Sequence, residues 1–197
     1  MKTTKSIILC ALLAFAGNAL RVSAADGLHV TDFTIAPGQT LNIPVELLNP
    51  DDSYIMLEFW MQLPEGVNID EDEDGELLVT ANTGRLTRHV LEIEAKGNNA
   101  YKVLIYSGRN TAIQGSEGAI FTMQMTAAAD AAVGNYQGRF YSQVFSNVDK
   151  QEYDPAESTF GVSINKTTLR GDLNEDGKVD VADVTELVNI ILGNSDM

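Results

Sequence analysis

Cysteine and histidine are the scarcest chemically active residues in this 197-residue chain, which has one cysteine and two histidines. The single Cys10 excludes an internal disulfide. His29 and His89 stand in no triad or zinc-site spacing, and the chain has no nucleophile elbow and no phosphate loop. We therefore expect a protein that is not an enzyme. A carboxylate pair at glycosidase separation is the catalytic alternative that 28 acidic residues leave open.

Basic residues are also few, because 13 of them stand against 28 acidic residues and the formal net charge is −15. A surface this acidic repels nucleic acid and anionic membranes and attracts cations. No apolar run approaches the roughly 20 residues that a membrane-spanning helix needs. We therefore expect no nucleic-acid partner and no membrane insertion of the mature chain.

Residues 1–24 have the pattern of a cleaved signal peptide. Lys2 and Lys5 precede the apolar run "IILCALLAFA", and "VSA" at 22–24 places small residues where a signal peptidase cuts. The run is too short for a transmembrane anchor, and Cys10 lies inside it rather than at a lipoprotein cleavage point. We expect export to the periplasm, the cell surface or the exterior. Since the exported chain has no disulfide, a bound metal is the expected additional source of stability.

Residues 26–164 alternate between apolar and polar side chains. Segments 41–47, 55–63 and 119–126 show the alternation most clearly, and turn sequences such as "APGQ" and "KGNN" separate such segments. This period predicts eight or nine strands with one buried face. The fold class is therefore mainly β, a jelly-roll or Greek-key β-sandwich. Pro44 inside the first segment predicts a sheet edge or a bulge there.

The pattern changes after residue 164, where a short linker (165–171) leads into "DLNEDGKVDVAD" at 172–183. A calcium loop of the EF-hand type needs oxygen ligands at its first, third, fifth, seventh, ninth and twelfth positions, and a glycine at the sixth. Gly177 is that glycine, and the seventh residue coordinates through its backbone carbonyl. The predicted calcium ligands are Asp172, Asn174, Asp176, Lys178, Asp180 and Asp183.

A similar acidic stretch, "DEDEDGELLVTA" at 70–81, satisfies only the first half of this pattern. Its ninth and twelfth positions are Leu78 and Ala81, which offer no side-chain oxygen. We interpret it as a solvated acidic turn between two strands, with weak adventitious calcium binding as the alternative.

The residues after the calcium loop have the spacing of a short amphipathic helix, with Gly193 as its C-terminal cap and a tail at 194–197. A lone helix of about ten residues is marginal in water, so its apolar face must be covered by the sandwich, a second copy or a partner chain. The residues expected to bind the partner are Val181, Val184, Leu187, Val188 and Ile191.

Segment 171–193 closely resembles one repeat of a type I dockerin, in which a calcium loop ends in Asp and runs into a single helix. The segment 26–164 is similar to a cohesin-type domain. The stretches "TLNIPVELLNPD", "FWMQLPEGVNI" and "GSEGAIFTMQM" resemble its opening strand, the strand that ends in a Pro-Glu-Gly turn, and its glycine-preceded strand. The resemblance implies a jelly-roll sandwich that binds proteins, often beside carbohydrate-degrading machinery. The combination also resembles small secreted proteins of Bacteroidetes.

Two departures limit what the dockerin resemblance implies. Dockerins normally carry two repeats, whereas this chain has one. Val181 and Ala182 stand where the family often has a Ser-Thr pair that contacts cohesin. The predicted function is a secreted, non-catalytic protein–protein assembly module with a calcium-stabilised docking element. The expected partner is a protein with a cohesin or dockerin module, or a second copy of this chain.

An alternative function is carbohydrate binding by the sandwich surface. In "YIMLEFWMQL" the alternation places Ile55, Leu57 and Phe59 toward the core. Trp60 and Tyr54 then share the opposite face, where aromatic rings can stack on a sugar. The competing interpretation is that Trp60 packs under a loop.

Overall fold

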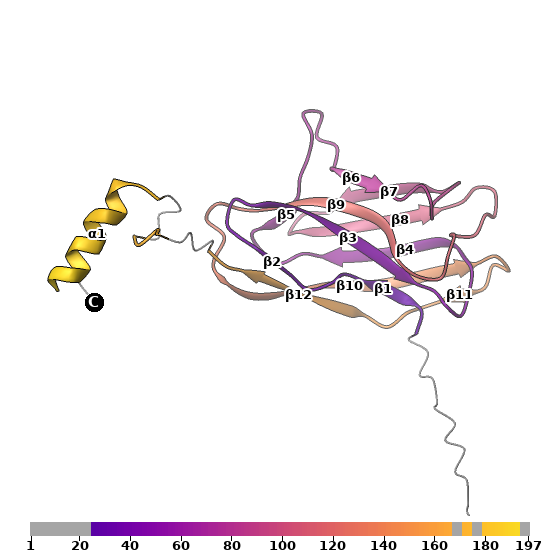
Figure 1. Ribbon diagram of the computed structural model, residues 1–197. Coiled ribbons are helices and arrows are strands. Elements are labelled where there is room, and N and C mark those ends of the chain that lie inside the picture. The colour runs from indigo at the N-terminus through magenta and orange to yellow at the C-terminus, as the bar shows by residue number, and fades with distance from the viewer. Residues whose placement is uncertain (1–24, 167–170, 175–178, 194–197) are drawn as a thin grey trace, which may run out of the picture.

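The computed structural model describes residues 25–166, 171–174 and 179–193 (Figure 1). The predicted signal peptide at 1–24, the tail at 194–197 and part of the linker lie outside these residues. The described residues form twelve strands and one helix. The elements are β1 (Gly27–His29), β2 (Phe33–Ile35), β3 (Thr40–Leu48), β4 (Tyr54–Gln62), β5 (Val67–Ile69), β6 (Val79–Ala81), β7 (Val90–Ala95), β8 (Ala100–Tyr106), β9 (Ala119–Ala127), β10 (Gly134–Asn147), β11 (Glu152–Tyr153), β12 (Ser158–Ile164) and α1 (Val181–Leu192).

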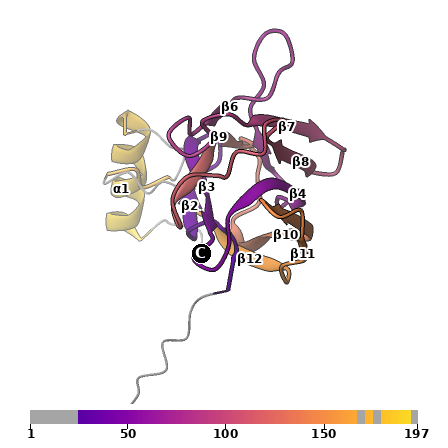
Figure 2. The ribbon, with the colours of Figure 1, turned by 90° about the vertical axis from the view of Figure 1, so that its right-hand side faces the viewer.

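The strands form two sheets that pack face to face (Figures 1 and 2). A five-stranded sheet has the order β1-β3-β9-β5, with β6 also paired to β9. A seven-stranded sheet has the order β2-β12-β10-β4-β8-β7, with β11 paired to β10. The predicted β-sandwich is confirmed. It has more strands than expected because five of them are only two or three residues long, too short for the alternation to identify.

The core lies between the sheets, where the alternating apolar side chains meet. Val45 and Leu47 of β3 and Phe121 and Met123 of β9 are fully buried, as the alternation predicts. Each such side chain contributes roughly 1.5–3 kcal/mol when it is removed from water. These contributions explain how a chain without a disulfide holds a sandwich together.

Pro44 lies at a sheet edge, as predicted. One side of β3 pairs with β9 along its length, including Pro44 opposite Thr122. The other side pairs with β1 only from Glu46 to Leu48. The register shifts directly after Val45, so a bulge follows the proline. A residue without a backbone N–H is tolerated here because that side of the strand has no ladder to complete.

The predicted alternation fails at the start of β4. Tyr54 is 2% exposed and lies in the core, whereas Ile55 is only half-buried. The register between β10 and β4 shifts at this point, which turns Tyr54 inward. Its hydroxyl donates a hydrogen bond of 2.7 Å to the Asp26 carboxylate, and burial together with this carboxylate raises the pKa of Tyr54. The prediction that Tyr54 shares an exposed face with Trp60 is therefore wrong.

A buried arginine fixes the loops at one end of the sandwich, and the sequence pattern did not identify it. Arg85 is 7% exposed, and burial lowers the pKa of its guanidinium. The group donates to the Asn49 side chain at 2.7 Å and to several backbone carbonyls. These carbonyls belong to Leu47, Gln114, Gly115 and Gly118. Arg85 thereby joins β3 to the loop before β9.

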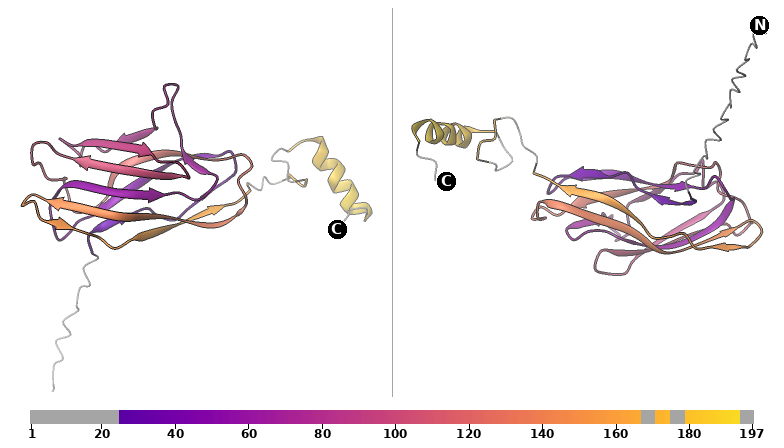
Figure 3. Two further views of the ribbon diagram at one scale, coloured as in Figure 1. Left: turned by 180° about the vertical axis from the view of Figure 1, so that it is seen from behind. Right: turned by 90° about the horizontal axis from the view of Figure 1, so that it is seen from below.

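The single described helix, α1, follows the sandwich in the chain, and Figures 1 and 3 show it beyond the end of β12. Gly193 adopts the left-handed conformation (φ 72°) and closes the helix, as predicted. None of the helices in the described part of the chain has the length and apolar character needed to cross a membrane.

Candidate docking face and calcium loop

The outer face of the central strands of the seven-stranded sheet carries the lone tryptophan. Cross-strand pairing places Trp60 of β4 between Tyr141 of β10 and Lys102 of β8. Residues paired in this way point to the same side of a sheet. We call this surface the tryptophan face. Its members are Met56, Glu58, Trp60, Lys102, Leu104, Tyr106, Tyr141 and Val144.

An aromatic pair occupies the centre of the tryptophan face. The rings of Trp60 and Tyr141 lie 6.0 Å apart between centroids, at 31° to each other. The guanidinium of Arg139 lies 4.6 Å from the centroid of the Tyr141 ring. Trp60 and Tyr141 are half-buried, so each ring keeps an accessible surface while its neighbours restrict its motion. Trp60 is thus on the exposed side of the sheet as predicted, with Tyr141 rather than Tyr54 beside it.

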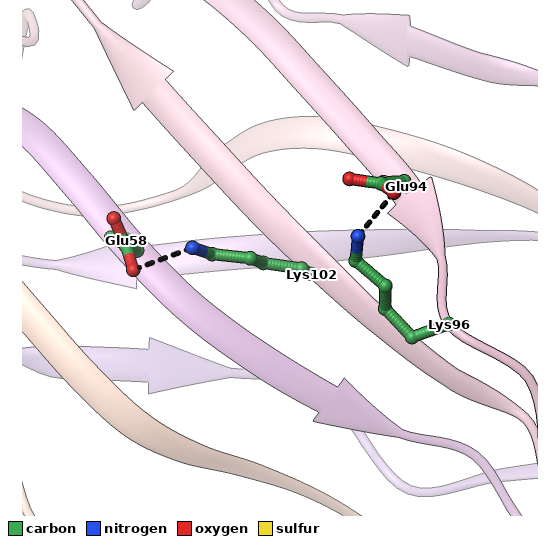
Figure 4. Close-up of polar contacts among 4 residues, drawn as sticks. All are labelled: Glu58, Glu94, Lys96 and Lys102. Atoms are coloured by element: carbon green, nitrogen blue, oxygen red, sulfur yellow. Dashed lines mark ion pairs between the residues drawn. The ribbon is translucent and has the colours of Figure 1, made fainter.

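Ion pairs flank the aromatic centre (Figure 4). Lys102 Nζ lies 2.9 Å from Glu58 Oε1, and Lys96 pairs with Glu94 at the outer strand. Exposed pairs of this kind contribute about 0–1 kcal/mol to folding. Because folding depends on them so little, their charges remain available to select and orient a charged partner.

The tryptophan face has the chemistry of a protein-binding surface. Trp, Tyr and Arg are the residues that most often dominate binding energy at interfaces, and here one of each lies in contact. A rim of charged residues around an apolar centre is the usual anatomy of such interfaces. Sequence reasoning found Trp60 but not Tyr141, Arg139 or Lys102, because only strand register brings these residues together.

The C-terminal unit contains four of the six predicted calcium ligands in its described part, and Asp176 and Lys178 lie outside it. Asp183 is 3% exposed and lies over the start of the loop. Its carboxylate accepts hydrogen bonds from the backbone N–H of Leu173 at 2.7 Å and of Asp180 at 2.7 Å. These donors, that of Asp180 first, lower the pKa of Asp183. The first and last positions of the predicted loop are therefore drawn together.

Asp180, the predicted ninth ligand, is also the N-cap of α1. Its Oδ1 accepts a hydrogen bond of 2.8 Å from the Ala182 N–H, and Asp183 completes a capping box with the Asp180 backbone. Among residues 25–166, 171–174 and 179–193, no three histidine, cysteine or acidic side chains come together as a metal-binding group. The central loop positions 175–178 lie outside this set. The all-oxygen ligand set and the closure by Asp183 are compatible with calcium.

The predicted partner-binding side chains of α1 are exposed. Val181 is 78% exposed, Val184 58% and Ile191 73%, and Leu187 and Val188 are also exposed. Only Asp183 is buried among the described residues of the helix. An apolar face of this kind is covered in a stable assembly, so the helix needs a further contact.

The upstream acidic stretch forms a turn between β5 and β6, as the sequence interpretation expects. Asp72 Oδ1 accepts hydrogen bonds from the N–H groups of Asp74 and Glu76, both at 2.9 Å. Asp70 accepts from Gln124 and Thr126 side chains of β9. One carboxylate oxygen each of Asp70 and Asp72 is therefore engaged within the protein, as in an acidic turn that braces itself.

The two histidines lie on or next to strands of different sheets. His29 is exposed on β1 opposite Glu46, whereas His89 precedes β7. Both ring nitrogens of His89 are buried without a hydrogen-bond partner among the described residues. Burial lowers the pKa of His89. Neither histidine is part of the tryptophan face.

Comparison with known proteins identifies the fold. No family model and no curated protein matches the chain. A chain from a type I cohesin–dockerin complex of Clostridium thermocellum is 18% identical with a TM-score of 0.57, and covers 72% of this chain and 100% of its own. The cohesin module of a Clostridium perfringens family 33 glycoside hydrolase is 12% identical (TM-score 0.56), covering 71% of this chain and 96% of its own.

A non-cellulosomal cohesin from the archaeon Archaeoglobus fulgidus is 15% identical with a TM-score of 0.54, and covers 71% of this chain and 91% of its own. Identities this low define the architecture rather than the ligand. The fold is a cohesin-like β-sandwich with one short C-terminal helix, which confirms the predicted fold class.

Proposed function

We propose that this protein is an exported, non-catalytic docking module whose cohesin-like sandwich binds a dockerin-type protein through the tryptophan face. The observation that carries the proposal is the contact of Trp60, Tyr141 and Arg139 on an exposed sheet of a sandwich with cohesin architecture. One of the similar structures is itself a cohesin–dockerin complex.

Binding between purified modules tests this proposal. Surface plasmon resonance would measure the full chain against dockerin-type modules encoded by the same organism, with and without calcium. We expect at least one of them to bind the wild type and to lose affinity with Trp60→Ala or Lys102→Glu. Thr80→Ala, on the opposite sheet, is the matched control and should bind as wild type. Absence of any dockerin-type partner, or equal affinity of Trp60→Ala, contradicts the proposal.

The C-terminal unit is a second docking element in this proposal, stabilised by calcium. Asp172, Asn174, Asp176, Asp180 and Asp183 would supply side-chain oxygens, and Lys178 its carbonyl. Calcium supplies the charge that holds these oxygens together and fixes the start of α1. The exposed side chains at 181, 184, 187, 188 and 191 then contact a cohesin-type protein, or a second copy of this chain.

Calorimetric titration of the full chain with calcium chloride tests the calcium assignment. We expect one site that Asp176→Asn or Asp183→Asn weakens. The matched control is Asp74→Asn in the similar acidic stretch at 70–81, and this variant should leave the titration unchanged. Heat that persists in Asp183→Asn but disappears in Asp74→Asn would transfer the site to the upstream stretch and overturn the assignment.

Export and a link to polysaccharide degradation complete the proposal. The N-terminal pattern of Lys2, Lys5 and an apolar run supports export. One similar structure is a cohesin module that belongs to a family 33 glycoside hydrolase, which supports a role beside carbohydrate-degrading enzymes. Detection of the chain without its first 24 residues outside the cytoplasm would test the first point.

A further inference from the structure

The outer face of the five-stranded sheet carries a groove of about 670 Å³, on the side of the molecule opposite the tryptophan face. Its floor is formed by Asn42 of β3, Thr122 and Gln124 of β9, and Thr80 of β6. Asp72 and Leu78 line its wall. The wall belongs to residues 70–78, called here the acidic hairpin, which rises from the sheet between β5 and β6 (Figure 1).

The acidic hairpin is internally braced, so the groove is formed before any ligand arrives. Glu71 and Leu77 pair as an isolated bridge, and the Asp72 N–H donates to the Glu76 carbonyl at 2.9 Å. The turn closes through Gly75, whose φ of 83° suits glycine. The Asp72 side chain accepts from two further N–H groups of the turn. Such bracing lowers the entropy that binding must overcome.

The floor presents polar groups that the described structure does not use. The Asn42 amide and the Thr80 and Thr122 hydroxyls make no hydrogen bond with other described residues. Gln124 is different, because its Nε2 donates to Asp70 Oδ2 at 3.0 Å. This bond orients the amide and leaves its oxygen as a fixed acceptor. Register places Thr122 beside Thr80 and Gln124 beside Asn42 on one side of the sheet.

The arrangement selects the chemistry of the ligand. Side-chain amides and hydroxyls pair with the hydroxyl groups of sugars, while Leu78 offers an aliphatic surface. The exposed carboxylates of the acidic hairpin repel an anionic ligand. At the centre of the floor a peptide cannot add as a strand, because β9 is paired on both sides, by β3 and by β5 and β6.

We infer that this groove is a binding site for a neutral oligosaccharide, separate from the protein-docking face. The acidic hairpin, which resembles a calcium loop in sequence, serves as the wall of the site. Asp70 is a positioning residue, since it holds the Gln124 amide. The site has no aromatic platform among its lining residues, so affinity is modest and rests on several hydrogen bonds.

Isothermal titration of the full chain tests this inference. The probes are neutral hexasaccharides of β-1,4-glucan, β-1,3-glucan, xylan and mannan, with oligogalacturonate as the anionic comparison. We expect at least one neutral probe to bind and oligogalacturonate to bind at least tenfold more weakly. Absence of binding by all neutral probes at millimolar concentration, or equal binding of the anionic probe, overturns the inference.

Variants locate the binding on the sandwich. The double variant Asn42→Ala/Gln124→Ala should lower affinity about tenfold or more, since it removes two hydrogen-bonding amides. Thr159→Ala, an exposed strand threonine of the other sheet, is the matched control. Trp60→Ala should also bind sugar normally, which separates this site from the docking face. If Trp60→Ala loses oligosaccharide binding and the double variant keeps it, the inference is overturned. This result does not depend on the outcome of the protein-binding experiment.

Discussion

The sandwich and the C-terminal unit are held together in opposite ways. The sandwich buries its apolar side chains between two sheets and pairs its buried cation with carbonyls and an amide, so its stability is internal. In α1 the buried side chain is a carboxylate, and the apolar ones are exposed. The comparison teaches that the first unit has a core of its own, whereas the second leaves its apolar side chains exposed, which is why we propose that an ion and a partner stabilise it.

Arg85→Met gives the largest expected change, and it should affect the sandwich alone. The substitution removes the guanidinium hydrogen bonds to the carbonyls of Leu47 and Gln114 and to the Asn49 side chain. We expect a loss of about 3–5 kcal/mol in the free energy of unfolding. Urea unfolding monitored by tryptophan fluorescence measures it. Arg88→Met, at an exposed position, should lie near wild type, and equal losses in both variants would contradict the assigned role.

Trp60→Ala tests the next largest effect, which concerns binding rather than folding. Trp60 contacts Tyr141 at the centre of the exposed face, so its removal should weaken partner binding by about 2 kcal/mol, close to 30-fold. Unfolding should change less, because the side chain is only half-buried. Surface plasmon resonance and urea unfolding together separate the two. If Trp60→Ala lowers the free energy of unfolding but binds the partner with full affinity, then Trp60 serves the stability of the sandwich and not docking.

Asp183→Asn should loosen the C-terminal unit and leave the sandwich intact. The carboxylate accepts N–H groups at both ends of the loop, and the amide cannot replace all of these contacts. We expect about a tenfold loss of calcium affinity and lower helicity by circular dichroism.

The same carboxylate predicts a pH dependence. The pKa of Asp183 lies below the ordinary 3.8. The ionised carboxylate therefore contributes fully to the stability of the C-terminal unit above pH 3.8, and this contribution disappears as the pH falls below that value. Helicity of wild type should therefore persist at pH 5 and fall only at a pH below 3.8. If Asp183→Asn loses helicity over the same acidic pH range as wild type, Asp183 is not the cause of that loss.

His89 provides the smallest expected effect, confined to the sandwich. Burial lowers its pKa from the ordinary 6.5, so the unfolded chain binds more protons in the interval below pH 6.5. The contribution of His89 to the stability of the sandwich is complete above pH 6.5 and decreases as the pH falls below it. His89→Phe should therefore show a smaller drop in Tm between pH 7.5 and 5.5, with His29→Phe as the exposed control. Equal drops in all three proteins would refute the assignment.

Sequence periodicity predicted the sandwich because one-sided burial leaves a direct trace in every second residue, as along β3 and β9. It failed at Tyr54, since a single extra residue at a bulge reverses the side on which a strand residue lies. The cluster of Trp60 with Tyr141 and Arg139 joins strands about 80 residues apart, and no local pattern encodes that register. The calcium loop rests on local spacing alone, and the whole calcium site stays a prediction.

The position of the lone tryptophan has a practical consequence. Because Trp60 is half-buried on the tryptophan face and the chain has no second indole, its emission would respond to a protein that covers that face. A sugar bound in the opposite groove, or calcium bound in the C-terminal loop, would leave the surroundings of Trp60 unchanged. The molecule thus carries a built-in optical label that would separate a protein on the tryptophan face from the other two proposed ligands.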